Sequence, residues 1–229
     1  MATKAKTARK EIRGKTTSKK ANNYHHGALR AALIRSAREI LESEGYEALS
    51  LRAAARRAGV SQAAPYNHFV DKAALLAAIA ALGFKEFAAA MRQEMDGAVD
   101  PLARLNAAGI AYVAFATSNP GLFKLMFGSS IHQASGDPDL DTARNSAYEV
   151  LRGAVHSAQS DPRDATHDEL ESLRSWAFVH GLATMINAGT IAPDTYGARS
   201  ARELTAALFG SPPAEKEGSA RLAAKQTRK

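Results

Sequence analysis

Apolar residues recur every three or four positions along most of the chain from residue 23 onward. This spacing places them on one face of an α-helix. Caps and breakers divide the pattern into segments at residues 23–44, 51–58, 72–95, 101–118, 122–127, 138–155, 166–187 and 201–208. No stretch shows the alternation of a β-strand. The pattern therefore predicts an all-α fold.

Residues 51–69, LRAAARRAGVSQAAPYNHF, contain two short helical segments around a tight turn. Ala55 lets two helices approach closely, and Gly59 ends the first because Gly adopts the left-handed conformation without steric cost. The apolar side chain of Val60 is expected to fill the space beneath the turn, and Ser61 is expected to cap the second helix. The stretch predicts a helix-turn-helix, in which the second helix enters the major groove of DNA.

The second helix of this motif has a distinct outward face. At 100° per residue, Gln62, Ala63, Tyr66 and Asn67 share one side, while Pro65 lies on the other. Amide side chains suit adenine, and a methyl group suits thymine. The outward face is therefore predicted to read DNA bases.

The run SQAAPYNHFVDKAALL resembles the TetR-type bacterial repressors, in which a short recognition helix ends in an aromatic-x-His-Phe run and Asp-Lys opens a long helix. The resemblance extends from Tyr24 to about Leu76. Many relatives open the first helix with Tyr-His-His and have Arg where Asn67 stands here. The DNA contacts that the motif and the resemblance together imply are Ser50, Ser61, Gln62, Ala63, Tyr66, Asn67, His68, Lys72, Tyr24, His25 and His26. For Tyr24–His26 and Lys72 the expected partner is phosphate at a helix N-terminus.

Trp176, His180 and Gly181 resemble the Trp-His-Gly (WHG) signature of a C-terminal ligand-sensing domain in one branch of these repressors. The resemblance implies a homodimer that binds a double-stranded DNA operator. When an effector binds, the distance between its two DNA-binding domains is expected to change. The expected parts are a disordered basic arm at 1–22, a helix-turn-helix domain at 23–72, a ligand-binding and dimerisation domain at 73–210, and a disordered tail at 211–229.

Large adaptable side chains in the second domain are candidates for an effector cavity, although each one alone is more simply a core residue. The candidates are Phe84, Phe87, Met91, Tyr112, Phe115, Phe123, Met126, Phe127, Trp176 and His180. This lining predicts a small apolar or aromatic effector. Tyr112 and His180 are the side chains expected to hydrogen-bond its polar group. Segment 166–187 is apolar nearly all round, so residues 166–209 are expected to form the homodimer interface.

The net charge of +7 is carried by the ends of the chain. Residues 1–20 hold eight Lys and Arg against Glu11, and residues 211–229 hold five against two Glu. The N-terminal arm is expected to contact phosphate, and the C-terminal tail to aid solubility. A non-specific or architectural DNA-binding protein without an effector is the alternative hypothesis. The operator, the effector, the target genes, contacts of the tails with DNA, and repression versus activation all stay open.

Other classes of function lack support in the sequence. Cys is absent, which suits a reducing compartment and predicts a cytoplasmic location. The histidines are too scattered for a zinc site, and no motif of a nucleotide-dependent or hydrolytic enzyme is present. No apolar run is expected to span a membrane. We therefore expect a non-enzymatic protein without cofactor or metal.

Overall fold

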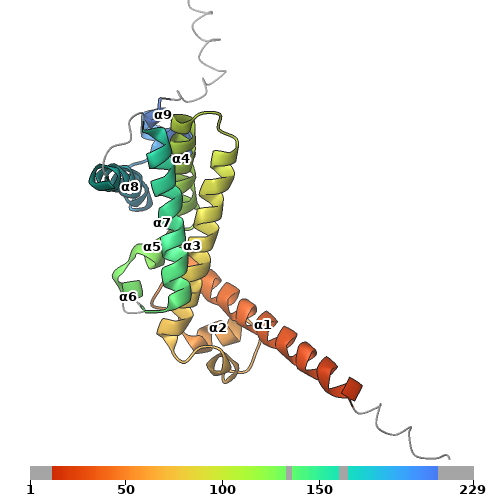
Figure 1. Cartoon of the computed structure of the whole chain (residues 1–229). Coiled ribbons are helices and arrows are strands. Elements are labelled where there is room, and N and C mark those ends of the chain that lie inside the picture. The colour runs from red at the N-terminus through yellow and green to blue at the C-terminus, as the bar shows by residue number, and fades with distance from the viewer. Residues whose placement is uncertain (1–11, 133–135, 160–164, 211–229) are drawn as a thin grey trace, which may run out of the picture. The chain divides into compact units, whose positions relative to one another are not determined.

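The computed structural model describes residues 12–132, 136–159 and 165–210. All regular elements in these ranges are helical, which confirms the all-α prediction (Figure 1). The elements are α1 (Ile12–Ser43), α2 (Leu51–Arg57), the 3₁₀-helix η1 (Ala64–Asn67), α3 (Lys72–Asp96), α4 (Pro101–Ser118), α5 (Pro120–Phe127), α6 (Ser129–His132), α7 (Pro138–Ala158), α8 (Ala165–Asn187), the 3₁₀-helix η2 (Pro193–Tyr196) and α9 (Ala201–Leu208).

The chain divides into two compact units. Unit 1 comprises residues 1–80 together with 124–137, and unit 2 comprises 81–123 together with 138–229. The division falls inside α3, so this one helix contributes to both units. Residues 124–137 join unit 1 although they follow α4 in the chain, a grouping that no sequence pattern predicts.

Unit 1 is built on α1 and α2, and α2 also packs against η1. Leu33, Ala37 and Ile40 of α1 are buried, as their helical spacing predicts. Leu49 and Phe69 bracket the helix-turn-helix segment and are buried as well. Burial of these apolar side chains fixes the short helices, which are too short to be stable alone.

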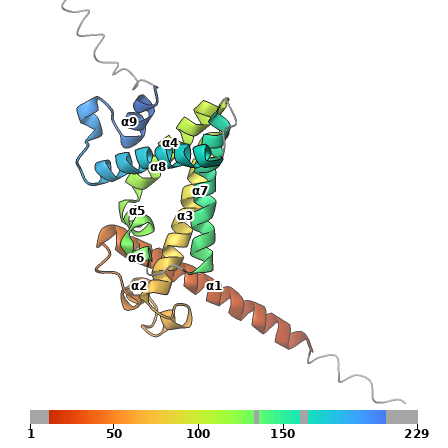
Figure 2. The same cartoon turned by 60° about the vertical axis from the view of Figure 1, so that its left-hand side comes forward.

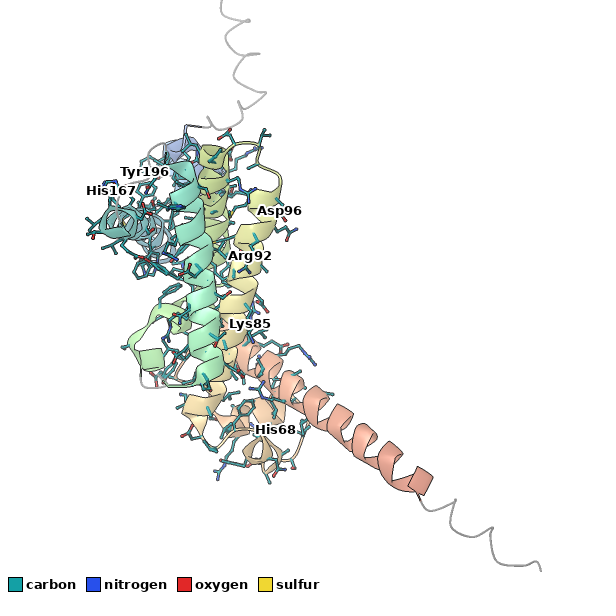
Figure 3. All side chains as sticks on the ribbon, in the orientation of Figure 1. His68, Lys85, Arg92, Asp96, His167 and Tyr196 are labelled. Atoms are coloured by element: carbon teal, nitrogen blue, oxygen red, sulfur yellow. The ribbon has the colours of Figure 1, made fainter. Side chains whose placement is uncertain are left out.

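Unit 2 is a helical bundle in which α4 packs against α7, α8 and α9. Figure 2 shows α7 running beside α3 and α8 crossing α4. Side chains of α3 and α7 contact each other. Arg92, labelled in Figure 3, donates from Nη2 to Ser146 Oγ at 3.3 Å. The Arg144 guanidinium lies 5.9 Å from the centroid of the Phe84 ring.

Side-chain caps define the starts of several helices. Ser50 Oγ accepts from Ala53 N at 3.1 Å, Asp71 Oδ1 from Ala74 N at 2.8 Å, and Asp100 Oδ1 from Ala103 N at 2.8 Å. Each cap satisfies an N–H that the first turn leaves without a partner. These three caps confirm the helix starts that the sequence predicts.

Three helix boundaries differ from expectation. The first helix begins at Ile12 rather than near Asn23, because residues 12–22 contain no proline and a helix can extend through them. Residues 129–132 form α6 instead of loop, since the buried Ile131 anchors the turn. α8 begins at Ala165, one residue before the predicted start, and its Glu169 accepts a hydrogen bond from the Tyr148 hydroxyl at 2.9 Å.

Helix α3 is long and apolar enough to cross a membrane by length and composition, with a mean hydropathy of 1.7 over its most apolar window. The helix is not an uninterrupted apolar run, because Lys85 and Glu86 lie within it. Within the protein, 61% of that window is buried, as in the core helix of a soluble bundle. The apolar content of α3 therefore follows from its place in the core of both units.

Candidate functional site

The corner of the helix-turn-helix has the local structure that its sequence predicts. α2 ends at Arg57, and Gly59 has φ +70°, in the left-handed region where Gly alone is unstrained. Val60 N donates to the carbonyl of Ala55 at 3.0 Å, which closes the turn on the end of α2. Ala55 is fully buried, consistent with a close approach of backbones.

The second element of the motif is a short 3₁₀-helix, and Ser61 does not cap it with its side chain. The cap residue of η1 is Ala63, without a side-chain hydrogen bond, and the carbonyl of Ser61 accepts from Ala64 N at 3.0 Å. The reason is Pro65, whose missing N–H cannot make the α-helical bond to Ser61. The turn closes through i→i+3 bonds instead.

The outward face of this element carries the side chains expected to read DNA. Gln62, Ala63, Tyr66 and Asn67 are all exposed, and Tyr66 has 51% of its surface accessible. Pro65 beneath them is buried. The face therefore stands on an apolar base and offers amide, methyl and phenol groups to solvent.

Lys72 and His68 lie at the edge of this face. The Lys72 ammonium donates to the carbonyl of Tyr46 at 3.2 Å and lies 4.1 Å from the centroid of the Tyr46 ring. This partner offsets the unfavourable position of a cation in the first turn of α3. His68, labelled in Figure 3, is half-buried. Its ring centroid lies 6.5 Å from that of Phe69. Tyr46 was not expected from the sequence to position Lys72.

Tyr24, His25 and His26 lie within α1, more than two turns after its start at Ile12. The expectation that they open the helix is therefore wrong, and the argument from free N–H groups at a helix N-terminus does not apply to them. Their side chains are outside the described residues. A contact with phosphate remains a prediction from the resemblance alone.

The other basic side chains of unit 1 differ in their partners. Arg57 pairs with Glu44 at 2.5 Å, and the Arg30 guanidinium lies 5.3 Å from the centroid of the Phe69 ring. Arg52 and Arg56 are exposed on α2. Their i,i+4 spacing places both guanidinium groups on the outer side of α2, which gives this side a local positive charge. The two arginines and their spacing are visible in the sequence.

In unit 2, several predicted ligand-binding residues form one aromatic cluster. The rings of Phe87 and Tyr112 meet edge to face with centroids 4.7 Å apart, and Phe115 stands 5.1 Å from Phe87. Phe123 lies 6.0 Å from Tyr112 and 5.2 Å from His180. These separations are those of favourable aromatic pairs. The cluster draws on α3, α4, α5 and α8.

A hydrogen-bonded chain runs through the cluster. Trp176 Nε1 donates to the Tyr112 hydroxyl at 3.1 Å, and this hydroxyl lies 2.9 Å from His180 Nδ1. The direction of the hydrogen bond between the Tyr112 hydroxyl and Nδ1 depends on which nitrogen of the neutral His180 ring carries the proton. Burial raises the pKa of Tyr112 and lowers the pKa of His180. Both groups are therefore neutral at pH 7.

The remaining predicted ligand-binding residues divide between the units. Phe84 and Met91 are buried on α3 in unit 2. Met126 is buried and Phe127 half-buried, and both belong to unit 1. The structure thus brings together six of the ten candidates, namely Phe87, Phe115, Tyr112, Phe123, Trp176 and His180. In the parts of the chain described, no three His, Asp or Glu side chains gather as a metal site would require.

Comparisons with known proteins agree with this architecture. Residues 33–79 match the model of bacterial regulatory proteins of the tetR family, and residues 105–215 match that of the tetracyclin repressor-like C-terminal domain. A helix-turn-helix with an outward polar face, in one chain with a second helical unit, defines the class of DNA-binding regulators of transcription. The chain belongs to the TetR family.

Individual relatives extend this result. A protein of unknown function from Rhodococcus sp. RHA1 is 34% identical and has a TM-score of 0.68, with 82% of this chain and 95% of that chain covered. The regulator PfmR from Thermus thermophilus shares the fold at 20% identity, with a TM-score of 0.55 and coverages of 78% and 94%. The nucleoid occlusion factor SlmA of Vibrio cholerae is 29% identical over 103 residues, 44% of this chain and 53% of its own length. The chain thus spans about half the length of the curated relatives it matches.

Proposed function

We propose that this chain is a ligand-responsive repressor that binds a palindromic DNA operator as a homodimer in the cytoplasm. The observation that carries the proposal is the exposed face of Gln62, Ala63, Tyr66 and Asn67 above the buried Pro65. These groups match the hydrogen-bonding and methyl pattern of A·T base pairs. No acidic side chain stands among them to repel phosphate.

Phosphate contacts supply affinity that is independent of sequence. Lys72 has three N–H donors and uses one of them on Tyr46, so two are available to DNA. Ser50 keeps its hydroxyl proton while its oxygen caps α2. The basic residues of segment 1–22 are expected to add to this sequence-independent affinity.

Pairing of two chains is supported by α8. Leu170, Leu173, Phe178 and Met185 of this helix are between 41% and 53% exposed, while Val179 on the opposite side is buried. Apolar side chains exposed along one helix face are typical of a protein interface. Two-fold pairing through residues 166–209 would give the protein two reading elements, about one DNA turn apart.

Response to an effector is supported by the aromatic cluster and by α3. Phe84, Phe87 and Met91 belong to the helix whose first residue is Lys72. A small apolar or aromatic molecule among these side chains would displace α3, and the Trp176–Tyr112–His180 chain would hydrogen-bond its polar group. The resemblance of Trp176, His180 and Gly181 to a WHG-type domain belongs to this part of the proposal.

Selection of DNA fragments by the purified protein tests the proposal, followed by titration of Gln62→Ala against every single-base variant of the selected site. Loss of a base contact should cost about 1–3 kcal/mol at one position of each half-site. Gln93→Ala, the same change at an exposed position of α3, is the matched control. Equal weakening at all positions would exclude Gln62 as a base reader. Failure of unlabelled selected DNA to compete better than unrelated DNA would favour the non-specific alternative.

A further inference from the structure

A cavity of about 250 Å³ lies in unit 2 between α4, α8 and the residue that follows α9. Leu105 of α4, Phe178 and Val179 of α8, Leu151 of α7 and Phe209 form its apolar walls. An apolar cavity of about 150 Å³ is large enough for benzene, and sites for drug-sized ligands begin at about 300 Å³. The volume therefore suits a single ring with one substituent.

The shape of the cavity depends on Gly109. A Cβ atom at this position would stand 2.7 Å from the Phe209 ring and 3.3 Å from Val179 Cγ1. The Phe209 ring therefore lies directly against the backbone of α4. Its centroid is 5.9 Å from that of Phe178, with the two planes inclined at 46°. Two aromatic faces set at an angle form a wall that another ring can contact favourably.

Two neutral polar side chains, Asn106 of α4 and Ser175 of α8, also line the cavity. Within the part of the chain that the structure describes, neither side chain makes a hydrogen bond, although both are half-buried. A half-buried polar group can take its hydrogen-bond partner from solvent or from a bound molecule. Their amide and hydroxyl donors are thus positioned to bind an acceptor on a molecule inside the cavity.

Among the residues that the structure describes, the lining of the cavity includes a single charged side chain. Arg174 is the charged residue in its lining, and no acidic residue accompanies it there. Its guanidinium pairs with Glu171 on the surface of α8 at 2.5 Å. Exposed ion pairs of this kind contribute little free energy, so Arg174 can exchange Glu171 for a ligand carboxylate without a large cost. A carboxylate also accepts the two donors of Asn106 and Ser175 better than a neutral group does.

From these contacts we infer that the cavity is a binding site for a monocyclic aromatic carboxylate. The ring lies against Phe178 and Phe209, and the carboxylate accepts from Asn106, Ser175 and Arg174. The site is distinct from the Tyr112–His180 cluster and goes beyond the proposed function. Phe178 is also part of the exposed face of α8, so a bound carboxylate stands beside the proposed pairing surface.

The test uses the full-length protein and 4-fluorobenzoate, with binding followed by fluorine NMR. About ten heavy atoms allow saturable binding with a Kd in the low millimolar range or tighter. Arg174→Met removes the charge at an exposed position and should weaken binding roughly tenfold, as loss of a charge-assisted hydrogen bond does. Arg199→Met, which breaks the similarly exposed Arg199–Glu203 pair elsewhere, is the matched control and should bind as the wild type.

Two further measurements locate the ligand and identify its recognised group. Ser175→Phe fills the cavity and should abolish binding, whereas 4-fluorobenzyl alcohol, which lacks the charge, should bind the wild type roughly tenfold more weakly than the carboxylate. Absence of saturable 4-fluorobenzoate binding to the wild type overturns the inference. Equal binding to the wild type, Arg174→Met and Ser175→Phe places the probe elsewhere and overturns it too. Equal affinity for the acid and the alcohol removes the carboxylate assignment.

Discussion

The Tyr112 hydroxyl is expected to stabilise unit 2 through its two hydrogen bonds, and Tyr112→Phe isolates that contribution. The ring stays in place, since Tyr112 is 2% exposed and packs edge to face with Phe87. The change removes the hydrogen bonds that the hydroxyl makes with Trp176 Nε1 and His180 Nδ1. A buried group left unpaired costs about 1–3 kcal/mol. Trp176 and His180 are only half-buried and water can reach them, so we expect a loss of about 1–2 kcal/mol.

The same variant is expected to change the pH dependence of stability. Burial lowers the pKa of His180 in the folded protein, so below the ordinary value of about 6.5 the unfolded chain binds more protons than the folded one. The contribution of His180 to stability is therefore complete above pH 6.5 and is lost as the pH falls through the folded pKa. We predict that Tyr112 donates to Nδ1, and such a bond favours the neutral ring. In Tyr112→Phe the pKa of His180 should rise, and the acid loss should become shallower.

Urea unfolding followed by fluorescence provides the measurement, because Trp176 is the only tryptophan and reports on unit 2. Tyr148→Phe is the matched control. Its hydroxyl donates to Glu169 at the surface at 2.9 Å, so its loss should cost less than about 1 kcal/mol. Unchanged or increased stability of Tyr112→Phe at pH 7.5 would refute the hydrogen-bonded chain. An acid limb as steep as in the wild type would refute the coupling to His180.

Further substitutions test the proposed dimer interface, a buried hydroxyl and the close packing at Gly109. Leu173→Glu on the exposed face of α8 should convert the proposed dimer to monomer in sedimentation experiments, and an intact dimer would remove this face from the interface. Ser172→Ala should raise the free energy of unfolding by about 1 kcal/mol, since its fully buried hydroxyl has no partner among the described residues; a loss would show that the hydroxyl is bonded. Gly109→Ala should lower that free energy by about 1–3 kcal/mol because its Cβ meets Phe209, whereas Gly153→Ala on α7, with open space around it, should be neutral or stabilising. Equal effects of the two glycine changes would contradict the close packing at Gly109.

Helix starts were predictable where a single side chain decides them. Ser50, Asp71 and Asp100 cap helices in the structure as their sequence context predicts, because capping involves residues only three apart. Ser61 is also a serine at a predicted helix start, but its side chain does not cap η1. Pro65 lacks the N–H that an α-helix would need at that position. A correct prediction there required weighing the cap against the proline four residues later.

The candidate site was predictable only as a set of residue types. Aromatic side chains at helical spacing identified most of the cluster, but the hydrogen bonds that organise it join residues 64 and 68 positions apart. Nothing in the local sequence pairs Tyr112 with Trp176 or His180. The cavity beside Phe209 was missed for the same reason, since its walls come from three helices and a residue beyond α9. Gly109 was its one available signal, as a glycine inside an apolar helix marks a close approach.

Under the proposed function, the tight winding of η1 limits the number of base pairs that one protomer can read. A 3₁₀-helix rises about 2 Å per residue, so the stretch from Ala63 to Asn67 spans about 8 Å, or two to three base pairs at about 3.4 Å each. Two such elements together would distinguish only about a thousand sequences, against roughly a million or more competing sites. Recognition of one operator in a genome then requires sequence information other than direct contacts to base edges. Stiffness and groove width of the intervening DNA can supply it, and so can several operators clustered at one promoter.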